Sequence, residues 1–445
     1  MAMNRKRRFT ARTAFLALAA LAWAIPALAA TFTVNSTADA VDIILGDGIC
    51  ASALDGCTLR AAIQEANASA GADTIVLPAG TYVLDIPGLE ENTAITGDLD
   101  IASDLTISGA GAKTTIIDGN EIDRVFHVQS GATLNLSGVT VQNGNSTAGT
   151  NKDGGGINNQ GTTTIDNVAV NGNTSGNGGG VYNNGTLTIT NSTLSNNVAD
   201  PAFPSGWGGA IYNNSTATLT NVTISGNTAD TGAGILMQPG TIATILNCTI
   251  ANNSGASSSG VGLMGNGGFS GSVKKTVLSN NLMGSGLGSS NCYQVGNSSA
   301  DGYNISSDDT CFFSDVTDNV NTNPLLGPLQ DNGGPTMTQA LLEGSPAIDR
   351  VPGAQAPATD QRGITRPQVG KAAGSALADI GAYEAVYVAP IPSPSTSSSG
   401  GCSVSGSGGV PGEIPGAFGA LVLILVGLRI AASRRLSRKT SRPGE

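Results

Sequence analysis

Short runs in which apolar residues alternate with Thr, Ser or Asn recur along residues 100–285, for example at 186–190 and 217–220. This alternation predicts strands with one buried face, because successive side chains of a strand point to opposite sides. Gly, Asn and Ser fill the positions between the runs and predict turns, since they tolerate positive φ. An apolar face with helical period is absent from this region, which favours an all-β fold.

A glycine-rich motif repeats in step with these runs. It begins at Gly154, Gly178 and Gly208 and returns more loosely at Gly232 and Gly260, at steps of 24, 30, 24 and 28 residues. A period of this length indicates a solenoid. Leucine-rich repeats have a similar period but need a ladder of leucines that this chain lacks. We therefore predict a right-handed parallel β-helix with two or three short strands in each coil.

Equivalent positions of such a stack lie above one another, about 4.8 Å apart. One inward aliphatic row is expected at Ile157, Val181, Ile211, Ile235 and Leu263. A polar row, with side-chain amides bonding to the coils above and below, is expected at Asn167, Asn191, Asn221 and Asn247.

The N-terminal residues predict export and a cap for the solenoid. Residues 1–29 have the basic start, the apolar stretch and the Ala27-Leu28-Ala29 cleavage site of a secretory signal peptide. Thr58 can cap a helix that runs to Asn67 and carries apolar residues on one face. A solenoid has an open end whose core needs covering, so we expect this short helix to form its lid.

Two segments carry a resemblance to bacterial surface proteins. Residues 57–67 (CTLRAAIQEAN), followed by 73–82, resemble the CSLREA domain, with Thr58 in place of the usual Ser and Ala61 in place of the usual Glu. The sequences DNGGPT at 331–336, GSPAID at 344–349, DQRG at 360–363 and DIGAYE at 379–384 are similar to the choice-of-anchor Q proteins. The resemblance implies a surface-displayed β-helix and implies no defined reaction.

The C-terminal end predicts an anchor. A linker rich in Pro, Ser and Gly contains Gly400, Gly401 and Cys402, and an apolar stretch and a basic tail follow it. This order resembles bacterial C-terminal sorting signals of the GlyGly and MYXO types, in which a protease releases the protein from its membrane helix; a permanent single-span anchor is the alternative. The expected division is a signal peptide (1–29), cap and first strands (30–97), β-helix (98–324), choice-of-anchor Q-like segment (325–385), linker (386–412), transmembrane or sorting helix (413–432) and cytoplasmic tail (433–445).

The cysteines and the net charge of the chain indicate its cellular compartment and limit its possible partners. In an exported chain we expect the disulfides Cys50–Cys57 and Cys292–Cys311, with Cys248 packed as a small buried residue. The formal charge is −11, and residues 31–412 hold 30 acidic against 10 basic residues. This excess of negative charge makes nucleic acid an unfavourable partner. The expected partners are the export and sorting machinery, the membrane through the C-terminal helix, and extracellular polysaccharide.

Some of the acidic residues are candidate metal ligands or catalysts. No cofactor is expected, although calcium is the ion that clustered carboxylates would take; the candidate ligands are Asp98, Asp100, Asp104, Asp308 and Asp309. Asp153, Asp200 and Asp230 are the candidate catalytic carboxylates, with turn capping as the simpler interpretation. His127 is interpreted as structural. Tyr182, Trp207 and Tyr212 are candidates for stacking on sugar rings, because the two tyrosines occupy equivalent places on successive coils.

These observations favour an exported, non-enzymatic protein of the bacterial cell surface or outer envelope, anchored in the membrane or released after C-terminal processing. Its expected role is an adhesion or glycan-contacting scaffold. The alternative is a polysaccharide lyase or glycoside hydrolase acting on extracellular polysaccharide. Against a lyase, which would use Arg as its base, no Arg occurs between Arg124 and Arg350.

Overall fold

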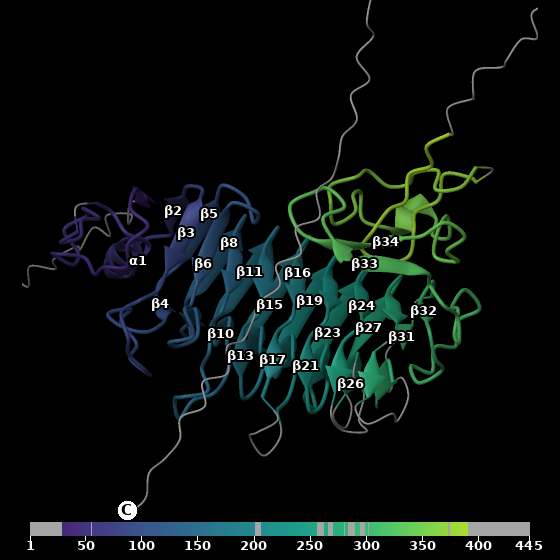
Figure 1. Cartoon of the computed structure of the whole chain (residues 1–445), viewed down its shortest axis with the longest axis horizontal. Coiled ribbons are helices and arrows are strands. Elements are labelled where there is room, and N and C mark those ends of the chain that lie inside the picture. The colour runs from purple at the N-terminus through teal and green to yellow at the C-terminus, as the bar shows by residue number, and fades with distance from the viewer. Residues whose placement is uncertain are drawn as a thin grey trace, which may run out of the picture. The chain divides into compact units, whose positions relative to one another are not determined.

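The structure is an all-β parallel β-helix of the right-handed type (Figure 1). This computed structural model describes residues 29–54, 56–200, 206–255, 262–265, 270–279, 281–283, 290–293, 299–300, 302–372 and 374–389. All of them belong to one compact unit that ends at Ala389. The predicted signal peptide up to Leu28, the linker with Gly400, Gly401 and Cys402, the transmembrane or sorting helix and the basic tail lie outside the described residues.

Four parallel sheets run along the solenoid, and we number them I to IV. Sheet I contains, in spatial order, β1 (Thr31–Thr33), β2 (Asp73–Leu77), β5 (Leu105–Gly109), β8 (Thr133–Ser137), β11 (Thr162–Asp166), β15 (Thr186–Thr190), β19 (Thr216–Thr220), β23 (Ile242–Leu246), β27 (Ser270–Lys274) and β31 (Ser299–Ala300). Sheet II contains β4 (Leu99–Ile101), β7 (Phe126–Val128), β10 (Ile157–Asn159), β14 (Val181–Asn183), β18 (Ile211–Asn213), β22 (Ile235–Met237), β26 (Leu263–Gly265) and β30 (Cys292–Tyr293).

The other two sheets complete the coils. Sheet III contains β3 (Gly80–Val83), β6 (Thr115–Asp118), β9 (Thr140–Gln142), β12 (Ala169–Asn171), β16 (Thr193–Ser195), β20 (Thr223–Ser225), β24 (Thr249–Ala251), β28 (Val277–Ser279) and β32 (Ile305–Ser306). The short sheet IV contains β13 (Thr174–Ser175), β17 (Val198–Ala199), β21 (Thr228–Ala229), β25 (Ser254–Gly255) and β29 (Leu282–Met283).

The predicted alternation sets the core. In β15, Leu187 and Ile189 point inward and are fully buried, whereas the threonines between them face outward. The predicted inward row is confirmed: each member pairs in register with the next and is 0% exposed, through Ile157, Val181, Ile211, Ile235 and Leu263. A second inward row on sheet I extends the same core.

The predicted polar row is only partly formed, because its asparagines occupy a left-handed corner. Asn167, Asn191, Asn221 and Asn247 have φ values between 49° and 56°, which Asn tolerates better than most residues. The Asn221 side chain does donate to Asn191 Oδ1 at 3.2 Å, but Asn247 donates instead to carbonyls of the C-terminal segment. The continuous amide row lies elsewhere on the coil.

That row runs through the interior at the end of sheet III. From Asn197 to Asn281, the Asn Oδ1 accepts from the backbone N and from Nδ2 of the Asn one coil earlier, as Asn227 does from Asn197 at 2.9 and 3.0 Å. Its own Nδ2 donates both to a carbonyl of the preceding coil and to the next Oδ1. We call this set the asparagine ladder; its members are Asn173, Asn197, Asn227, Asn253, Asn281 and Asn291.

The two ends of the stack are closed differently. Helix α1 (Leu59–Ala68) lies at the N-terminal end (Figure 1). Its apolar residues belong to the main core cluster. The predicted cap is confirmed, since Thr58 Oγ1 accepts from the Ala61 amide at 3.1 Å. Arg60, fully buried in this helix, donates to both oxygens of Asp39 at 2.6 and 3.0 Å and to three carbonyls that precede β4.

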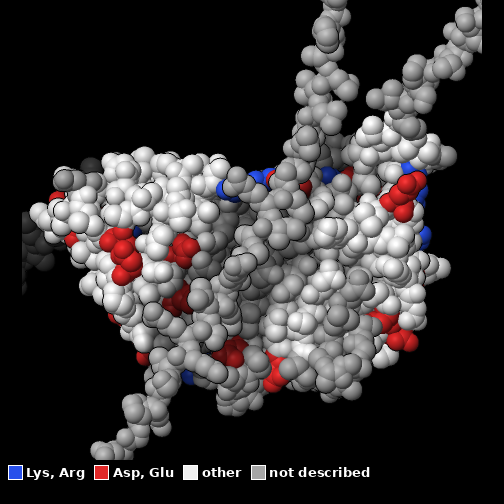
Figure 2. Space-filling model, viewed as in Figure 1, with Lys and Arg blue, Asp and Glu red and all other residues white. Residues whose placement is uncertain are grey.

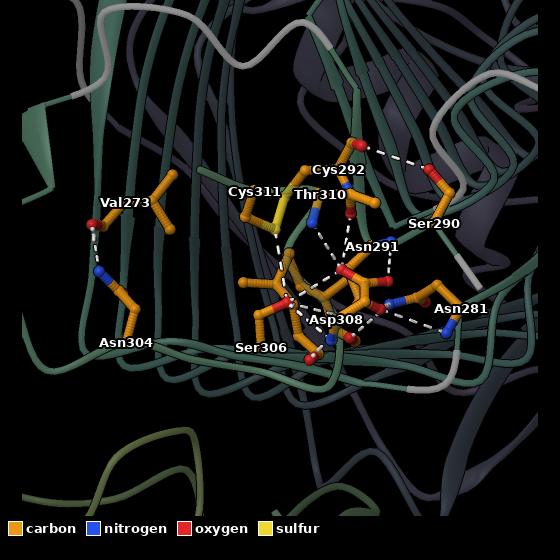
Figure 3. Close-up of a disulfide and its surroundings, with 12 residues drawn as sticks. Val273, Asn281, Ser290, Asn291, Cys292, Asn304, Ser306, Asp308, Thr310 and Cys311 are labelled. Carbon is orange, nitrogen blue, oxygen red and sulfur yellow. Dashed lines mark hydrogen bonds between the residues drawn. A yellow bond between two sulfur atoms is a disulfide. The ribbon is translucent and has the colours of Figure 1, made fainter. Parts of the chain in front are cut away.

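At the other end, the asparagine ladder finishes on a carboxylate (Figure 3). Asp308 Oδ2 accepts from the Asn291 amide at 2.9 Å, and its Oδ1 accepts from the Thr310 hydroxyl at 2.6 Å. The predicted disulfide Cys292–Cys311 lies beside it and is confirmed, as is Cys50–Cys57 at the N-terminal end. Cys248 is a buried free thiol, and burial raises its pKa to about 12, so it is inert packing.

The chain then turns back along the outer face of sheet III. The antiparallel pair β33 (Leu326–Gln330) and β34 (Thr338–Leu341) and a 3₁₀ turn (Gly353–Gln355) lie in this returning segment (Figure 1). A second apolar cluster attaches it, in which Ile348 and Ile380 pack against Val277 of β28. We call residues 325–389 the C-terminal strap.

Candidate functional site

A groove of about 480 Å³ lies between the outer face of sheet III and the C-terminal strap. Strands β6, β9, β12 and β16 form its floor, and residues 331–337 form one wall. Its volume falls in the range of sites for small ligands. The lining is mainly amide, hydroxyl and small apolar groups from Ala112, Lys113, Ile116, Thr140, Gln142, Ala169, Asn171, Thr193, Ser195, Asn196, Asp331, Pro335, Thr336 and Met337.

One row of polar side chains runs along the floor and continues beyond the groove to Asp118. Asp118, Gln142, Asn171 and Ser195 are register neighbours on successive strands, and all face outward. Neighbouring members bond to each other: Gln142 Nε2 donates to Asp118 Oδ2 at 2.8 Å, and Ser195 Oγ donates to Asn171 Oδ1 at 3.0 Å. These bonds fix the side chains and leave further lone pairs and protons for a ligand. A second cavity of about 340 Å³ adjoins this row at Asp118 and Asn143.

Gln361 holds the wall of the groove against the floor. Its Nε2 donates to the hydroxyls of Thr193 and Thr336 and to the Met337 carbonyl, all within 3.0 Å. Its Oε1 accepts from the Thr223 hydroxyl at 2.6 Å. Since Gln361 is buried, the wall has a defined position. The sequence motif around residue 361 gave no sign of this role, because every partner on the solenoid is more than 130 residues away.

The charges near the groove are few. Lys113 Nζ and Asp331 Oδ2 form an ion pair at 2.7 Å across its mouth, with both side chains about half exposed. The hydrogen bond from Lys113 lowers the pKa of the Asp331 carboxyl, so this carboxylate is ionised at neutral pH. Figure 2 shows a face that is mostly uncharged, with acidic side chains over the N-terminal coils and along the lower edge and basic ones near the upper edge.

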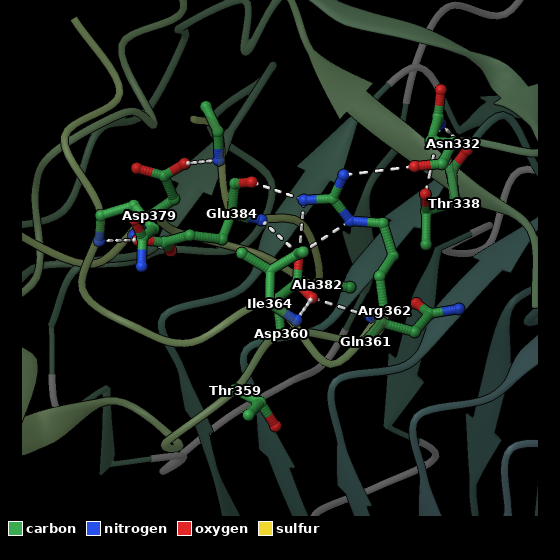
Figure 4. A network of polar contacts seen from close by, with 12 residues as sticks. Asn332, Thr338, Thr359, Asp360, Gln361, Arg362, Ile364, Asp379, Ala382 and Glu384 are labelled. Carbon is green, nitrogen blue, oxygen red and sulfur yellow. Dashed lines mark hydrogen bonds and ion pairs between the residues drawn. The ribbon is translucent and has the colours of Figure 1, made fainter. Parts of the chain in front are cut away.

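A buried polar network organises the strap behind the groove (Figure 4). Asp360 Oδ2 accepts from Arg362 Nη2 at 2.7 Å and from the Glu384 amide at 2.9 Å. Arg366 Nε lies 3.1 Å from Glu384 Oε2, and both side chains are fully buried. Burial, then the charge of Glu384, raises the pKa of Asp379 to about 7.

This raised pKa makes the stability of the strap depend on pH. The folded-state pKa lies above the unfolded value, so the contribution of Asp379 is full below about pH 4 and is lost as pH rises through 7. We expect the difference in unfolding free energy between the wild type and Asp379→Asn to shrink by on the order of 3 kcal/mol between pH 4.5 and 8.5. Thermal or urea unfolding across this range measures it. Asp331→Asn, at the surface, should keep the wild-type slope; a constant difference for Asp379→Asn would contradict the assignment.

The three predicted aromatic residues come together on sheet II. Tyr182 and Tyr212 are register neighbours whose rings stack with centroids 5.0 Å apart, and the Trp207 ring lies parallel to that of Tyr212 at 6.3 Å. Because the stacked faces of the tyrosine rings contact each other, these faces are not available to a sugar ring. Between the two tyrosines the surface presents ring edges instead of a stacking platform. Leu236 and Met264 continue the row and bury Tyr212 to 8% exposure.

The predicted catalytic carboxylates occupy two places. Asp200 and Asp230 directly follow the paired strands β17 and β21, and their amides bond to Ser175 and Gly206 carbonyls of neighbouring turns. Asp153 belongs to a different row, where its Oδ1 accepts from Asn177 Nδ2 at 2.9 Å. Burial raises the pKa of Asp153, and its charge in turn contributes to the raised pKa of Tyr182.

The structure places the predicted metal ligands in separate parts of the fold. Asp98 and Asp100 are buried at β4 and face His127 of β7. Asp104 is exposed in the turn after β4, Asp308 is occupied as the end of the asparagine ladder, and Asp309 is exposed beside it. The interpretation of His127 as structural did not include its pairing with Asp100, which β4 and β7 bring into register and which His127 Nδ1 contacts at 2.9 Å. The sequence could in principle have indicated this pair, because Asp100 and His127 lie one coil apart.

Within the described ranges, none of the helices is long and apolar enough to cross a membrane. No protein-family model matches the chain, and no curated protein matches it. Among solved structures, the chain is similar to the crystal structure of pectate lyase Pel9A, with a TM-score of 0.42 and 16% sequence identity over 80% of this chain and 96% of that chain. A likeness this distant carries nothing about the site, and the fold assignment depends on the strand pairing described above.

Proposed function

We propose that this protein is an exported, non-enzymatic scaffold that holds a neutral glycan in the groove between sheet III and the C-terminal strap. The observation that supports this most directly is the row of Gln142, Asn171 and Ser195 on the groove floor. Amides and hydroxyls can exchange hydrogen bonds with sugar hydroxyls. Their spacing of one strand, about 4.8 Å, is close to the length of one pyranose unit, so a chain lying along the groove would meet one polar rung per sugar.

The charge of the protein favours a neutral glycan. The segment 31–412 carries a net formal charge of −20, and the cation at the groove mouth, Lys113, is already paired with Asp331. A polyuronate would therefore meet repulsion. The two disulfides support an oxidising compartment outside the cytoplasm, in agreement with the signal peptide and the surface location expected from the sequence.

The carboxylates at the groove support binding rather than hydrolysis. Asp118 accepts from the Asn120 amide and from the side chains of Gln142 and Asn143, so its oxygens are taken up in fixing the turn. Asp331 is held ionised by Lys113. A glycoside hydrolase needs a carboxylic acid with a raised pKa beside a second carboxylate. Asp331 therefore does not fit the acid role, and both oxygens of Asp118, beside the groove, are already hydrogen-bonded.

The test is glycan binding by the full chain and two matched variants. We expect binding to neutral tetra- to hexasaccharides of glucose, mannose, galactose or N-acetylglucosamine on an array, followed by calorimetry. Asn171→Ala removes one floor amide and should weaken affinity about tenfold, the loss of roughly 1.4 kcal/mol expected for one or two hydrogen bonds. Asn135→Ala removes an equivalent outward amide from β8 on sheet I and should leave affinity unchanged.

Two results would argue against this function. Equal affinities for Asn171→Ala and the wild type would place the glycan outside the groove. New reducing ends or unsaturated uronates, measured in parallel on neutral and acidic polysaccharides, would instead favour the polysaccharide lyase or hydrolase alternative. In that case Asp153→Asn, Asp200→Asn and Asp230→Asn become the variants to compare.

A further inference from the structure

Two aspartates and a histidine meet at the N-terminal end of sheet II. Asp98 directly precedes β4, Asp100 is its central residue, and His127 is the central residue of β7, paired in register with Asp100. One atom of each, a carboxylate oxygen from either aspartate and a ring nitrogen from His127, lies within 4.8 Å of the other two. The three residues are 3%, 0% and 9% exposed.

Several polar atoms here have no hydrogen-bond partner within the described part of the molecule. They are Asp98 Oδ1, His127 Nε2 and both amide atoms of Asn158, the next rung of the same row. Asn158 is 1% exposed. Buried polar groups are nearly always satisfied, because an unmade hydrogen bond costs about 1–3 kcal/mol. Four such atoms at one place indicate that a ligand is missing from the cluster.

The charges indicate the sign of that ligand. Asp98, Asp100 and Asp123 are all buried, and the neighbouring cation is Arg124, whose Nε lies 3.3 Å from Asp98 Oδ2 and 3.6 Å from Asp123 Oδ1. One guanidinium cannot compensate three carboxylates. A cation is therefore the species that this pocket lacks.

We propose that Asp98, Asp100 and His127 bind one divalent transition-metal ion of the zinc class. An imidazole nitrogen with two carboxylates suits zinc, manganese, cobalt or nickel, whereas calcium prefers oxygen ligands alone. This replaces the calcium site expected from Asp98, Asp100 and Asp104. His127 Nδ1 and Asp100 Oδ1 are hydrogen-bonded at 2.9 Å in this structure, so an ion that takes both groups as ligands would replace this hydrogen bond.

The surroundings would support such an ion. The Ala94 amide donates to Asp100 Oδ2 at 2.8 Å and orients this carboxylate; such outer contacts tune metal sites. Asn158 lies on β10, in register with His127 on β7. Its amide can bond to a fourth ligand of the ion, such as water. The loop that supplies Ala94 also receives the guanidinium of Arg60. The ion would therefore join the cap, this loop and the second coil.

The test measures metal uptake by the full chain after chelator treatment. ZnCl₂ should bind at one ion per chain and raise the thermal unfolding midpoint by several degrees, and CoCl₂ should give visible d–d bands that report a nitrogen and oxygen ligand set. His127→Ala should weaken zinc affinity at least 100-fold, and Asp104→Asn, an exposed neighbour, should leave it unchanged. The cobalt spectrum on the wild type answers the question even if His127→Ala does not fold.

Three outcomes would overturn the proposal. The first is no binding of zinc, cobalt, manganese or nickel at micromolar concentration. The second is binding that His127→Ala does not weaken, which would place the ion elsewhere. The third is stabilisation by CaCl₂ equal to that by ZnCl₂ and independent of His127. The glycan assay uses a different face of the molecule, so either proposal can fail without the other.

Discussion

Arg60→Ala is expected to lower the free energy of unfolding by about 3–5 kcal/mol. The Arg60 side chain is fully buried and pairs with both oxygens of Asp39, whose side chain is 2% exposed. Removing the guanidinium leaves a buried carboxylate without its cation. It also frees the carbonyls of Ala94, Gly97 and Asp98, which lie on the loop that precedes β4. Helix α1 should then separate from the first coils.

Denaturant unfolding and limited proteolysis measure this effect. Cleavage in the loop between Asp42 and Cys50 should become faster at denaturant concentrations that leave the later coils folded. The matched control is Lys113→Ala, which removes an ion pair that is about half exposed and should cost at most about 1 kcal/mol. The double variant Arg60→Met with Asp39→Asn should recover part of the loss. A cost for Arg60→Ala as small as that of the control would show that the cap does not depend on this pair.

Asn227→Ala, in the middle of the asparagine ladder, is expected to cost about 3 kcal/mol. The side chain accepts from the backbone N and Nδ2 of Asn197 and donates to the Leu194 carbonyl and to Asn253 Oδ1. All of these groups are in the interior, so each unmade bond leaves a polar atom without water. The variant also interrupts a row that joins coil to coil.

Hydrogen exchange is the measurement that locates this loss. The Asn197 amide loses its acceptor in Asn227→Ala, so its protection should fall before that of the sheet I strands. Asn214→Ala provides the control, because Asn214 is exposed and its side chain donates to Asn184 Oδ1 at 2.9 Å; a surface change of this kind stays within about 0.5 kcal/mol. Equal effects of the two variants would contradict the structural role assigned to the ladder.

The sequence predicted the features that repeat. The inward row through Ile211 and the strand period follow from local alternation, and the disulfides and the cap at Thr58 follow from short spacings. The asparagine row was placed at the wrong corner because two asparagines recur in each coil. Only the backbone distinguishes them: Asn221 takes a left-handed φ at a turn, whereas Asn227 bonds along the interior.

The candidate sites were harder to predict because they depend on distant segments. The wall of the groove comes from the strap, which reaches the solenoid through Gln361, 138 residues from its partner Thr223. The meeting of Asp100 with His127 depends on the length of a coil that precedes the first clear glycine motif. Arg60 lies in a motif that resembles a known domain, yet its partner Asp39 lies in an irregular loop without a pattern of its own.

The route of the C-terminal strap determines how the protein would carry load. The strap is attached to several coils in turn, through Thr359 to Asn221, Gln361 to Thr193 and Thr223, Ala382 to Thr249 and Gly381 to the Lys275 carbonyl. Tension applied at Ala389 would therefore be shared among these coils as shear instead of peeling the last coil from the stack. The middle of the solenoid would resist the pull, and the N-terminal coils would remain unloaded.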